Sequence, residues 1–204
     1  MYTKASIYNL ALGALLLNKR ISDVLTDTST ENQTLNVHYN TALISTLQDL
    51  DLDATATQKD LELIEEDPND LWSFAYKYPT NCAFLRRIQS AVVKDTRSTQ
   101  IPRRIANHGG VKAIFCHQES AVAEYVSTDL PLSLLSANAG LAVAYKLAQL
   151  AAPLIAGKGA AQLRKEIQAN YMLAKAEAQE HDRLENSNFD DDSTISEFVE
   201  ARLE

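Results

Sequence analysis

Residues 136–156 of this 204-residue chain read SANAGLAVAYKLAQLAAPLIA and include its most apolar window. Apolar side chains recur there at helical spacing on two faces, so a helix would be wetted over little of its surface. One face carries Leu141, Ala144, Tyr145, Ala148 and Ala152, and the other carries Val143, Leu147, Leu150 and Leu154. Such a helix packs between neighbours, in its own subunit or in another one. Gly157 and Gly159 are expected to end it.

Two amphipathic helices are expected before residue 51. The first spans about residues 4–17 and has Thr3 available as its cap. The second runs to about Asp49 and begins near two capping-box spacings, which pair Thr28 with Glu31 and Thr30 with Gln33. Residues 21–27 are rich in Ser, Thr and Asp, and this composition favours a loop. The two helices are therefore expected to form a hairpin.

After residue 51 the pattern changes to short segments bounded by turns. Strands are predicted at residues 71–78, 83–88, 103–106, 111–116 and 122–126. The glycines of Asn107-His108-Gly109-Gly110 permit the positive φ angles of a hairpin turn, and this tetrapeptide is expected to connect two of the strands. The acidic run EEDPND at residues 65–70 predicts a break. Residues 54–65 fit neither helix nor strand clearly.

Together with a long one-faced helix expected at residues 160–185, these patterns predict an α+β fold that is mainly α. Residues 1–50 and 130–185 are expected to form a helical bundle body. Residues 51–129 are expected to form a small β-sheet or hairpin insertion. Residues 186–204 are expected to be an extended acidic C-terminal tail that orders on a partner.

Charge is distributed unevenly along the chain. Residues 86–112 hold seven basic residues and one acid, whereas residues 185–204 hold seven acids and one base. Fields of this size steer and select partners rather than define a fold. Apolar residues in the tail fall at helical spacing, which is typical of a segment that folds on a partner. The sequence therefore indicates an interaction protein.

Composition excludes several other classes. The net charge of −8 and the isoelectric point near 5.0 argue against general nucleic-acid binding. Cys82 and Cys116 lack the spacing of a zinc site and the density of a disulfide scaffold, so buried free thiols in a reducing compartment are expected. No signal peptide is predicted, because Asn9, Gly13 and Lys19-Arg20 do not fit one and a small-residue cleavage site is lacking. No membrane span is predicted, because the most apolar window, residues 141–155, is too short to cross a bilayer.

No catalytic motif, cofactor site or metal site is predicted. His108-Gly109-Gly110 lacks the nucleophilic serine elbow that an esterase oxyanion loop needs. Cys116 and His117 would point to opposite faces of a strand. Gly157-Lys158-Gly159 is not preceded by the strand of a phosphate loop. Glu65, Glu66 and Asp67 could act as paired carboxylates, although an acidic run before Pro-Asn is more typical of a solvated turn.

Several runs carry a family resemblance. They are IYNLALG at residues 7–13, LWSFAYKYPTNC at 71–82, LRRI at 85–88 and LAVAYKLA at 141–148. In this order they resemble the head-to-tail adaptor (connector) proteins of tailed bacteriophages, in particular the tail tubular protein A type of short-tailed phages. One departure is visible, because residues 52–56 read LDATA where a Trp-Phe-Ala run is expected.

The resemblance implies a structural virion protein that is not an enzyme. It implies a homo-oligomeric ring, a dodecamer, that joins the portal protein to the tail or nozzle protein. DNA would pass through the channel of the ring without sequence-specific binding. The protein would be made in the host cytoplasm and lie at the head–tail junction of the virion. The alternatives are a tail-associated cell-wall-degrading hydrolase and a cellular helical protein-binding module.

Three groups of residues are expected to make the contacts of such an adaptor. The tail residues expected to bind the portal are Ile195, Phe198, Val199 and Leu203. The residues expected to face a neighbouring protomer are Leu147, Leu150 and Leu154. The basic patch expected to meet an acidic partner surface consists of Arg86, Arg87, Arg97, Arg103 and Arg104.

Overall fold

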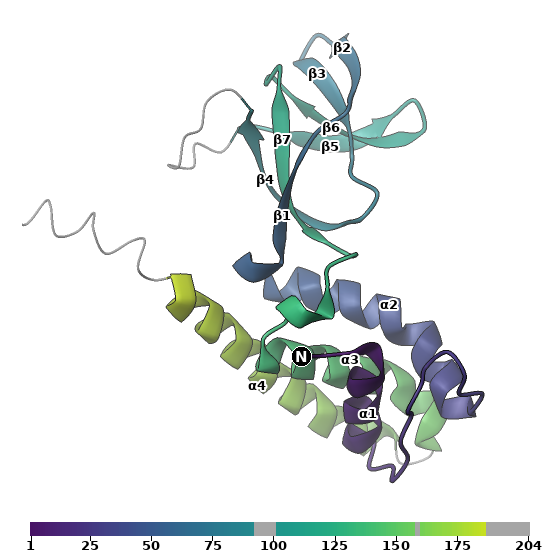
Figure 1. Ribbon diagram of the computed structural model, residues 1–204. Helices are drawn as coiled ribbons and strands as arrows, with labels where there is room; N and C mark the ends of the chain where they lie inside the picture. The colour runs from purple at the N-terminus through teal and green to yellow at the C-terminus, as the bar shows by residue number, and fades with distance from the viewer. Residues whose placement is uncertain (92–100, 158–159, 187–204) are drawn as a thin grey trace, which may run out of the picture. The chain divides into compact units, whose positions relative to one another are not determined.

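The computed structural model describes residues 1–91, 101–157 and 160–186 (Figure 1). These residues are 49% helical and 26% strand, with four α-helices and seven antiparallel strands in two sheets. The chain divides into a helical unit, Met1–Ala54 with Pro131–Glu204, and a β unit, Thr55–Leu130. The fold is α+β, and the expectation of a helical bundle with only a small hairpin insertion is wrong. The β unit has two sheets of its own and a core between them.

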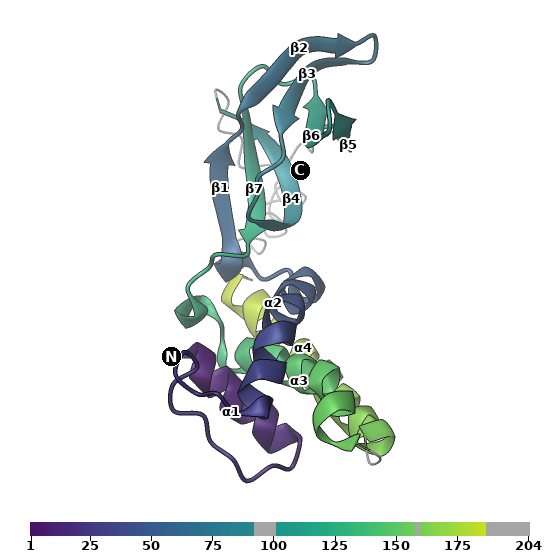
Figure 2. The same ribbon diagram turned by 90° about the vertical axis from the view of Figure 1, so that its right-hand side faces the viewer.

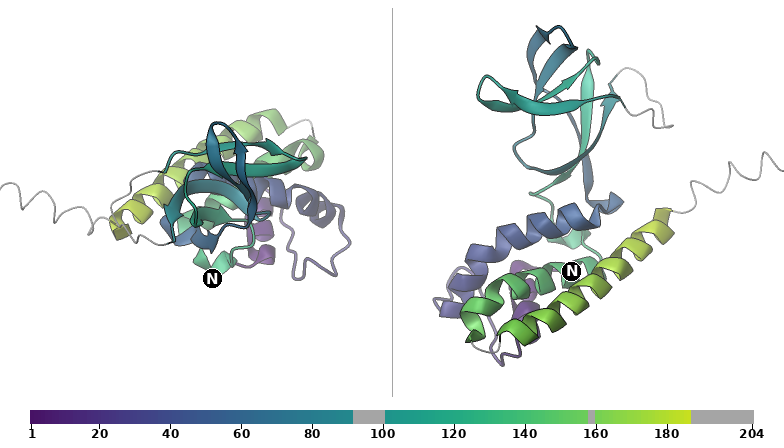
Figure 3. Two further views of the ribbon diagram at one scale, coloured as in Figure 1. Left: turned by 90° about the horizontal axis from the view of Figure 1, so that it is seen from above. Right: turned by 180° about the vertical axis from the view of Figure 1, so that it is seen from behind.

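Helix α3 is the centre of the helical unit. The unit comprises α1 (Lys4–Ala14), α2 (Thr30–Leu50), α3 (Ala137–Ile155), α4 (Ala160–Asn186) and the short 3-10 helix η2 (Leu132–Leu134). Helix α3 packs against α1, α2 and α4 (Figure 2), and it runs beside α4 in an antiparallel pair (Figure 3). Val143 and Leu147 are fully buried, as is Ala148. The prediction of a helix covered on two faces is confirmed for most of α3, but Leu154 near its end is 70% exposed.

The helix starts show where local sequence patterns succeed and where they fail. Thr3 caps α1 through a capping box with Ser6, as expected for its position. The cap of α2 is Ser29, whose hydroxyl accepts a hydrogen bond from the Asn32 amide at 3.3 Å, so both predicted capping boxes are wrong. The Ser29 amide donates to the Asp27 carboxylate at 2.7 Å, and this contact holds the turn that precedes the helix.

The β unit consists of two antiparallel sheets. The three-stranded sheet has the order β1-β7-β4 and the four-stranded sheet has the order β2-β3-β6-β5. The strands are β1 (Ala56–Asp60), β2 (Leu63–Asn69), β3 (Trp72–Lys77), β4 (Cys82–Ser90), β5 (Arg104–His108), β6 (Val111–Cys116) and β7 (Ala121–Ser127). A 3-10 helix, η1 (Asp53–Thr55), precedes β1. The core includes Tyr76, Leu85, Ile88, Ile114 and Tyr125.

The predicted hairpin is confirmed as the pair β5–β6, with a shorter turn than expected. Asn107 and His108 belong to β5, so the turn is only Gly109-Gly110, with φ angles of 58° and 85°. Both angles lie in the region that glycine adopts freely, which is typical of a two-residue turn. The Gly110 amide donates to the Asn107 side-chain oxygen at 3.0 Å.

The acidic run at residues 65–70 is not the break that its composition predicts. Residues 65–69 continue strand β2, which pairs with β3 through two register shifts. One shift falls between Glu66 and Asn69, where Asp67 has a φ of 48°. The bulge and Pro68 are tolerated because β2 is an edge strand, whose outward groups need no partner in the sheet.

Candidate interaction surfaces

A bulge in β4 aims two consecutive arginines at one carboxylate. The register of β4 on β7 shifts between Leu85 and Arg87, so Arg86 and Arg87 both reach Glu124. Arg87 donates from Nε at 2.9 Å and approaches with Nη2 at 2.8 Å, while Arg86 Nη1 lies 3.7 Å away. Without the extra residue of the bulge, side-chain alternation would turn one arginine to the opposite face.

Two amides complete the surroundings of Glu124. The side chains of Gln58 on β1 and Gln89 on β4 both donate to Glu124 Oε2, at 3.2 and 3.0 Å. Only 7% of Glu124 is exposed, and a carboxylate so far from water needs partners of this kind. We name Glu124, Arg86, Arg87, Gln58 and Gln89 the Glu124 cluster. Within it the two arginines neutralise an internal charge.

The other predicted basic residues are divided between the sheets. Arg103 Nη2 donates to the backbone carbonyls of Leu85 and Arg86, at 3.3 and 2.8 Å, and so covers part of the outer edge of β4. Arg104 is exposed on β5, in the other sheet. Arg97 lies outside the described residues. The structure thus gathers Arg86, Arg87 and Arg103 around β4 and leaves Arg104 apart.

A hydrogen bond joins the two edges of the four-stranded sheet. Glu65 on β2 and His108 on β5 meet with 2.6 Å between Oε2 and Nε2, although β3 and β6 separate their strands. Three strand spacings of about 4.8 Å would hold these edges about 14 Å apart in a flat sheet, so the sheet is curled. The His108 ring meets Phe115 edge-on at 5.6 Å. The sequence does not predict this pair, because the contact depends on the order of the strands in the sheet.

Another histidine contacts a serine on the same sheet. Ser73 Oγ lies 3.1 Å from His117 Nδ1, and the His117 ring stacks on Trp72 with centroids 5.0 Å apart. A nucleophile and base pair also needs a third group that orients the base. Within the described parts of the chain, no carboxylate makes an ion pair or hydrogen bond with His117. The contact is thus a polar and aromatic surface cluster.

The remaining candidates for chemistry are dispersed. Cys116 is fully buried in the core between the sheets, while Cys82 is partly buried. Burial raises the pKa of both thiols, which opposes thiolate formation. Glu65, Glu66 and Asp67 are all exposed, and Glu65 faces a histidine rather than a second acid. Over residues 1–91, 101–157 and 160–186, no three metal-ligating side chains come together.

The helical unit carries an apolar groove between α1, α3 and α4. Its volume is about 430 Å³. Its lining includes Leu10, Gly13, Ala14, Leu16, Leu141, Ala144, Leu163 and Ile167, with Glu166 as its one ionisable side chain other than Tyr145. We name it the α1 groove. The sequence does not predict this groove, because its lining comes from three different helices.

Leu16 stands at this groove in an unfavourable backbone conformation. Its φ is 60° and 81% of its surface is exposed. The position follows the end of α1, where the Leu17 amide donates to the Leu12 carbonyl at 3.0 Å. Glycine or asparagine usually occupies such a left-handed position, because a side chain like that of leucine crowds the backbone.

The leucines expected at a protomer contact do not share one surface. Leu147 is fully buried inside the helical unit and is not available to another copy. Leu150 is partly buried, and Leu154 is 70% exposed. The tail residues Ile195, Phe198, Val199 and Leu203 lie outside the described residues.

No helix in the described part of the chain combines the length and apolar character needed to cross a membrane. No known protein family model matches the sequence, and no curated protein matches it.

Proposed function

We propose that this chain is the subunit of a head-to-tail adaptor ring in a tailed bacteriophage. The ring joins the portal to the tail and surrounds the DNA channel. Two features support the proposal: the ordered runs that resemble such adaptors and the α1 groove on the helical unit. A protein of this kind works by binding other proteins, so surfaces that are unfavourable in the isolated subunit are expected.

Leu16 is the observation that carries the proposal. A leucine at φ 60° is disfavoured by about 1–2 kcal/mol relative to a right-handed conformation, and its side chain gains little in water when 81% exposed. Neither local propensity nor core packing explains this choice of residue. Burial against another protein does, because burying a leucine side chain contributes about 1.5–3 kcal/mol.

The composition of the groove selects the kind of partner. A lining with Glu166 as its only carboxylate or cation fits an apolar segment better than a charged one. We assign the portal protein as the occupant and an apolar segment of it as the contact. The hydrolase alternative loses support, because Glu65 contacts His108 rather than a second acid, and Glu65, Glu66 and Asp67 are all exposed.

The test is binding of the purified full chain to its cognate portal ring. The substitution Leu16→Asn removes the apolar side chain and places a residue that tolerates positive φ. We expect it to weaken portal binding at least tenfold while leaving the free energy of unfolding unchanged or raised by up to about 1 kcal/mol. Electron microscopy of the mixture reports whether a ring forms on the portal.

The matched control is Leu25→Asn, which changes another leucine that is 94% exposed and lies outside the groove. It should leave portal binding intact. A wild-type chain that ignores the portal would contradict the proposed function and favour the cellular binding module. If Leu16→Asn binds as well as the wild type, the assignment of the portal to the α1 groove is wrong.

A further inference from the structure

Helix α4 carries opposite charge at its two ends. Residues 160–175 include Arg164, Lys165 and Lys175 with Glu166 as the single acid. Residues 177–186 include Glu177, Glu180, Asp182 and Glu185 with Arg183 as the single base. The helix is buried along one stripe only, at Ala160, Ile167, Tyr171, Ala174 and Ala178. Both groups of charges therefore lie on faces that the helical unit leaves uncovered.

The start of α4 forms a basic hollow with α3. Gln149, Ala161, Arg164, Lys165 and Gln168 line a surface depression of about 440 Å³. Gln149 and Gln168 hydrogen-bond to each other across it, which holds the two helices in place. Among the described residues, no acid forms an ion pair with Arg164 or Lys165. We name Arg164 and Lys165 the basic end.

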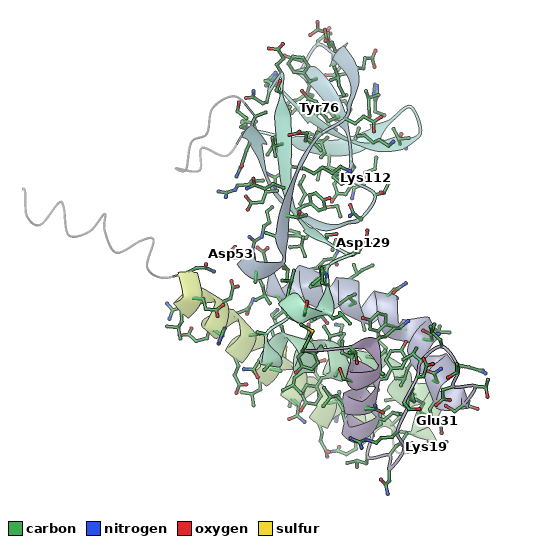
Figure 4. All side chains as sticks on the ribbon, in the orientation of Figure 1. Lys19, Glu31, Asp53, Tyr76, Lys112 and Asp129 are labelled. Atoms are coloured by element: carbon green, nitrogen blue, oxygen red, sulfur yellow. The ribbon has the colours of Figure 1, made fainter. Side chains whose placement is uncertain are left out.

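The far end of α4 forms an acidic hollow with the residues that follow α2. The Asp53 amide donates to the Asp182 carboxylate at 3.1 Å, and Gln179 donates to the Asp49 carbonyl at 3.2 Å. Figure 4 labels Asp53. These contacts bring the acids of residues 49–53 beside those of α4. A depression of about 240 Å³ lies here, lined in part by Leu52, Leu134, His181, Asp182 and Glu185. We name Glu177, Glu180, Asp182 and Glu185 the acidic end.

The ion pairs at the acidic end leave most of its charge uncompensated. Arg183 contacts Glu180 at 2.9 Å, and His181 lies 3.6 Å from Glu185. The first pair removes one negative charge, and the second acts only when the histidine is protonated. Like charges at this spacing repel one another. A cation from outside the subunit would therefore be stabilised here.

The two ends cannot neutralise each other within one molecule. The nearest charges, Lys165 and Glu177, are 12 positions apart, and at 1.5 Å per residue a continuous helix holds them about 18 Å apart. Two different surfaces that are complementary to each other are what a head-to-tail contact between identical subunits requires.

We propose that the basic end of one copy binds the acidic end of a second copy of this chain. The partner is this chain itself, because it presents the complementary charges on a surface that remains free. This contact rests on the proposed function in one respect, because an adaptor ring also requires contacts between copies of the chain. The α1 groove shares no lining residue with either end, but its α4 residues Leu163 and Ile167 lie close in sequence to the basic end. Self-association is therefore measured without the portal.

The charge-reversal pair Arg164→Glu/Lys165→Glu and Glu177→Lys/Glu185→Lys tests the contact. The first variant is acidic at both ends and the second is basic at both ends, so neither should associate with itself. Mixed together they should associate, because each then offers the complement of the other. Sedimentation velocity of the full chains without portal, at about 0.01 M salt where the Debye length is about 30 Å, measures this.

We expect the wild type to associate with an association constant that falls about tenfold or more between low salt and about 1 M salt. Arg20→Glu/Lys59→Glu is the matched control, because it makes the same change of net charge at exposed residues outside both ends. It should associate like the wild type. A monomeric wild type at low salt, or a mixture that fails to associate, overturns the inference. Self-association without portal binding would uphold it while contradicting the proposed function.

Discussion

Gly140 lies so close to the ring of Tyr2 that no side chain fits between them. A Cβ at this position would stand 2.1 Å from Tyr2 Cε2, and the Tyr2 hydroxyl donates to the Ala137 carbonyl at 2.7 Å. Gly140→Ala should therefore displace the ring and break that hydrogen bond. We expect unfolding free energy to fall by about 1–2 kcal/mol, even though alanine favours a helix over glycine by about 1 kcal/mol. Chemical denaturation followed by far-ultraviolet circular dichroism measures the change.

The same substitution should change sign once the ring is gone. In a Tyr2→Ala background, Gly140→Ala meets nothing and keeps only the helix-propensity gain, so it should stabilise by up to about 1 kcal/mol. Gly13, which also lies in a helix but has open space around it, provides the control for propensity alone. Destabilisation of equal size in both backgrounds would mean that Tyr2 does not determine the residue at position 140.

Single residues were predictable from sequence where their interactions are local. The Thr3 cap involves Ser6 three residues away, and the sequence places it correctly. Glu124 could not be paired with Arg87, because 37 residues separate them and a bulge sets their register. Leu16 gives no sequence signal either, since an exposed leucine after a helix is ordinary until its φ is known.

At the scale of elements, the Glu124 cluster depends on the bulge in β4, because the bulge brings both Arg86 and Arg87 to Glu124. Glu124→Ala would leave Arg86, whose side chain is only 13% exposed, without its carboxylate. We expect the free energy of unfolding of the β unit to fall by about 2–4 kcal/mol, because the mostly buried arginine charge loses its counter-charge. Trp72 is the only tryptophan and lies in β3, so its fluorescence reports unfolding of this unit.

The control for that prediction is an exposed ion pair in the same unit. Glu62 meets Lys77 at 3.4 Å with its side chain 74% exposed. Glu62→Ala should change the unfolding free energy by no more than about 0.5 kcal/mol, because water screens such pairs. If Glu124→Ala proves equally mild, water or movement of the arginines compensates for the lost charge and the cluster is not a stabilising centre.

Elements were predictable where burial imposes a pattern. Large apolar and polar residues alternate in the sequence of β3, and the turn Gly109-Gly110 needs residues that accept positive φ, so both were found. Strands β1 and β2 were missed because nearly all of their side chains are exposed, which removes the apolar alternation. These two segments are recognisable as strands only from their pairing with β7 and β3, and the sequence of a segment does not show which strand it pairs with.

The whole molecule divides into two units with different cores, and the error in the expected fold class follows from that division. The sequence shows the helical unit well, because α3 is apolar on two faces. The sequence predicts the extent of the β unit poorly, because the core between its sheets is assembled from alternate residues of separate strands. Tyr76, Ile114 and Tyr125 are fully or almost fully buried there, yet each is flanked in sequence by residues of another face.

Buried tyrosines in both units predict a steep loss of stability in alkali. Burial, and next Cys116, raises the pKa of Tyr76 from its ordinary 10 to about 12. In the helical unit, burial and then the Asp49 carboxylate raise the pKa of Tyr171 as well, and Tyr171 donates to that carboxylate at 2.6 Å. Each folded unit therefore keeps a proton that the unfolded chain releases near pH 10.

The sign of the pH dependence follows from that difference. Below pH 10 both states hold the proton and stability does not change, whereas above it the unfolded state alone loses the proton. Each such tyrosine should then lower the unfolding free energy by about 1.4 kcal/mol per pH unit, for Tyr76 up to about pH 12. Tyr76→Phe should flatten the alkaline slope seen by Trp72 fluorescence, and Tyr171→Phe the slope seen by helical circular dichroism. Slopes that neither substitution changes would show that other groups govern alkaline unfolding.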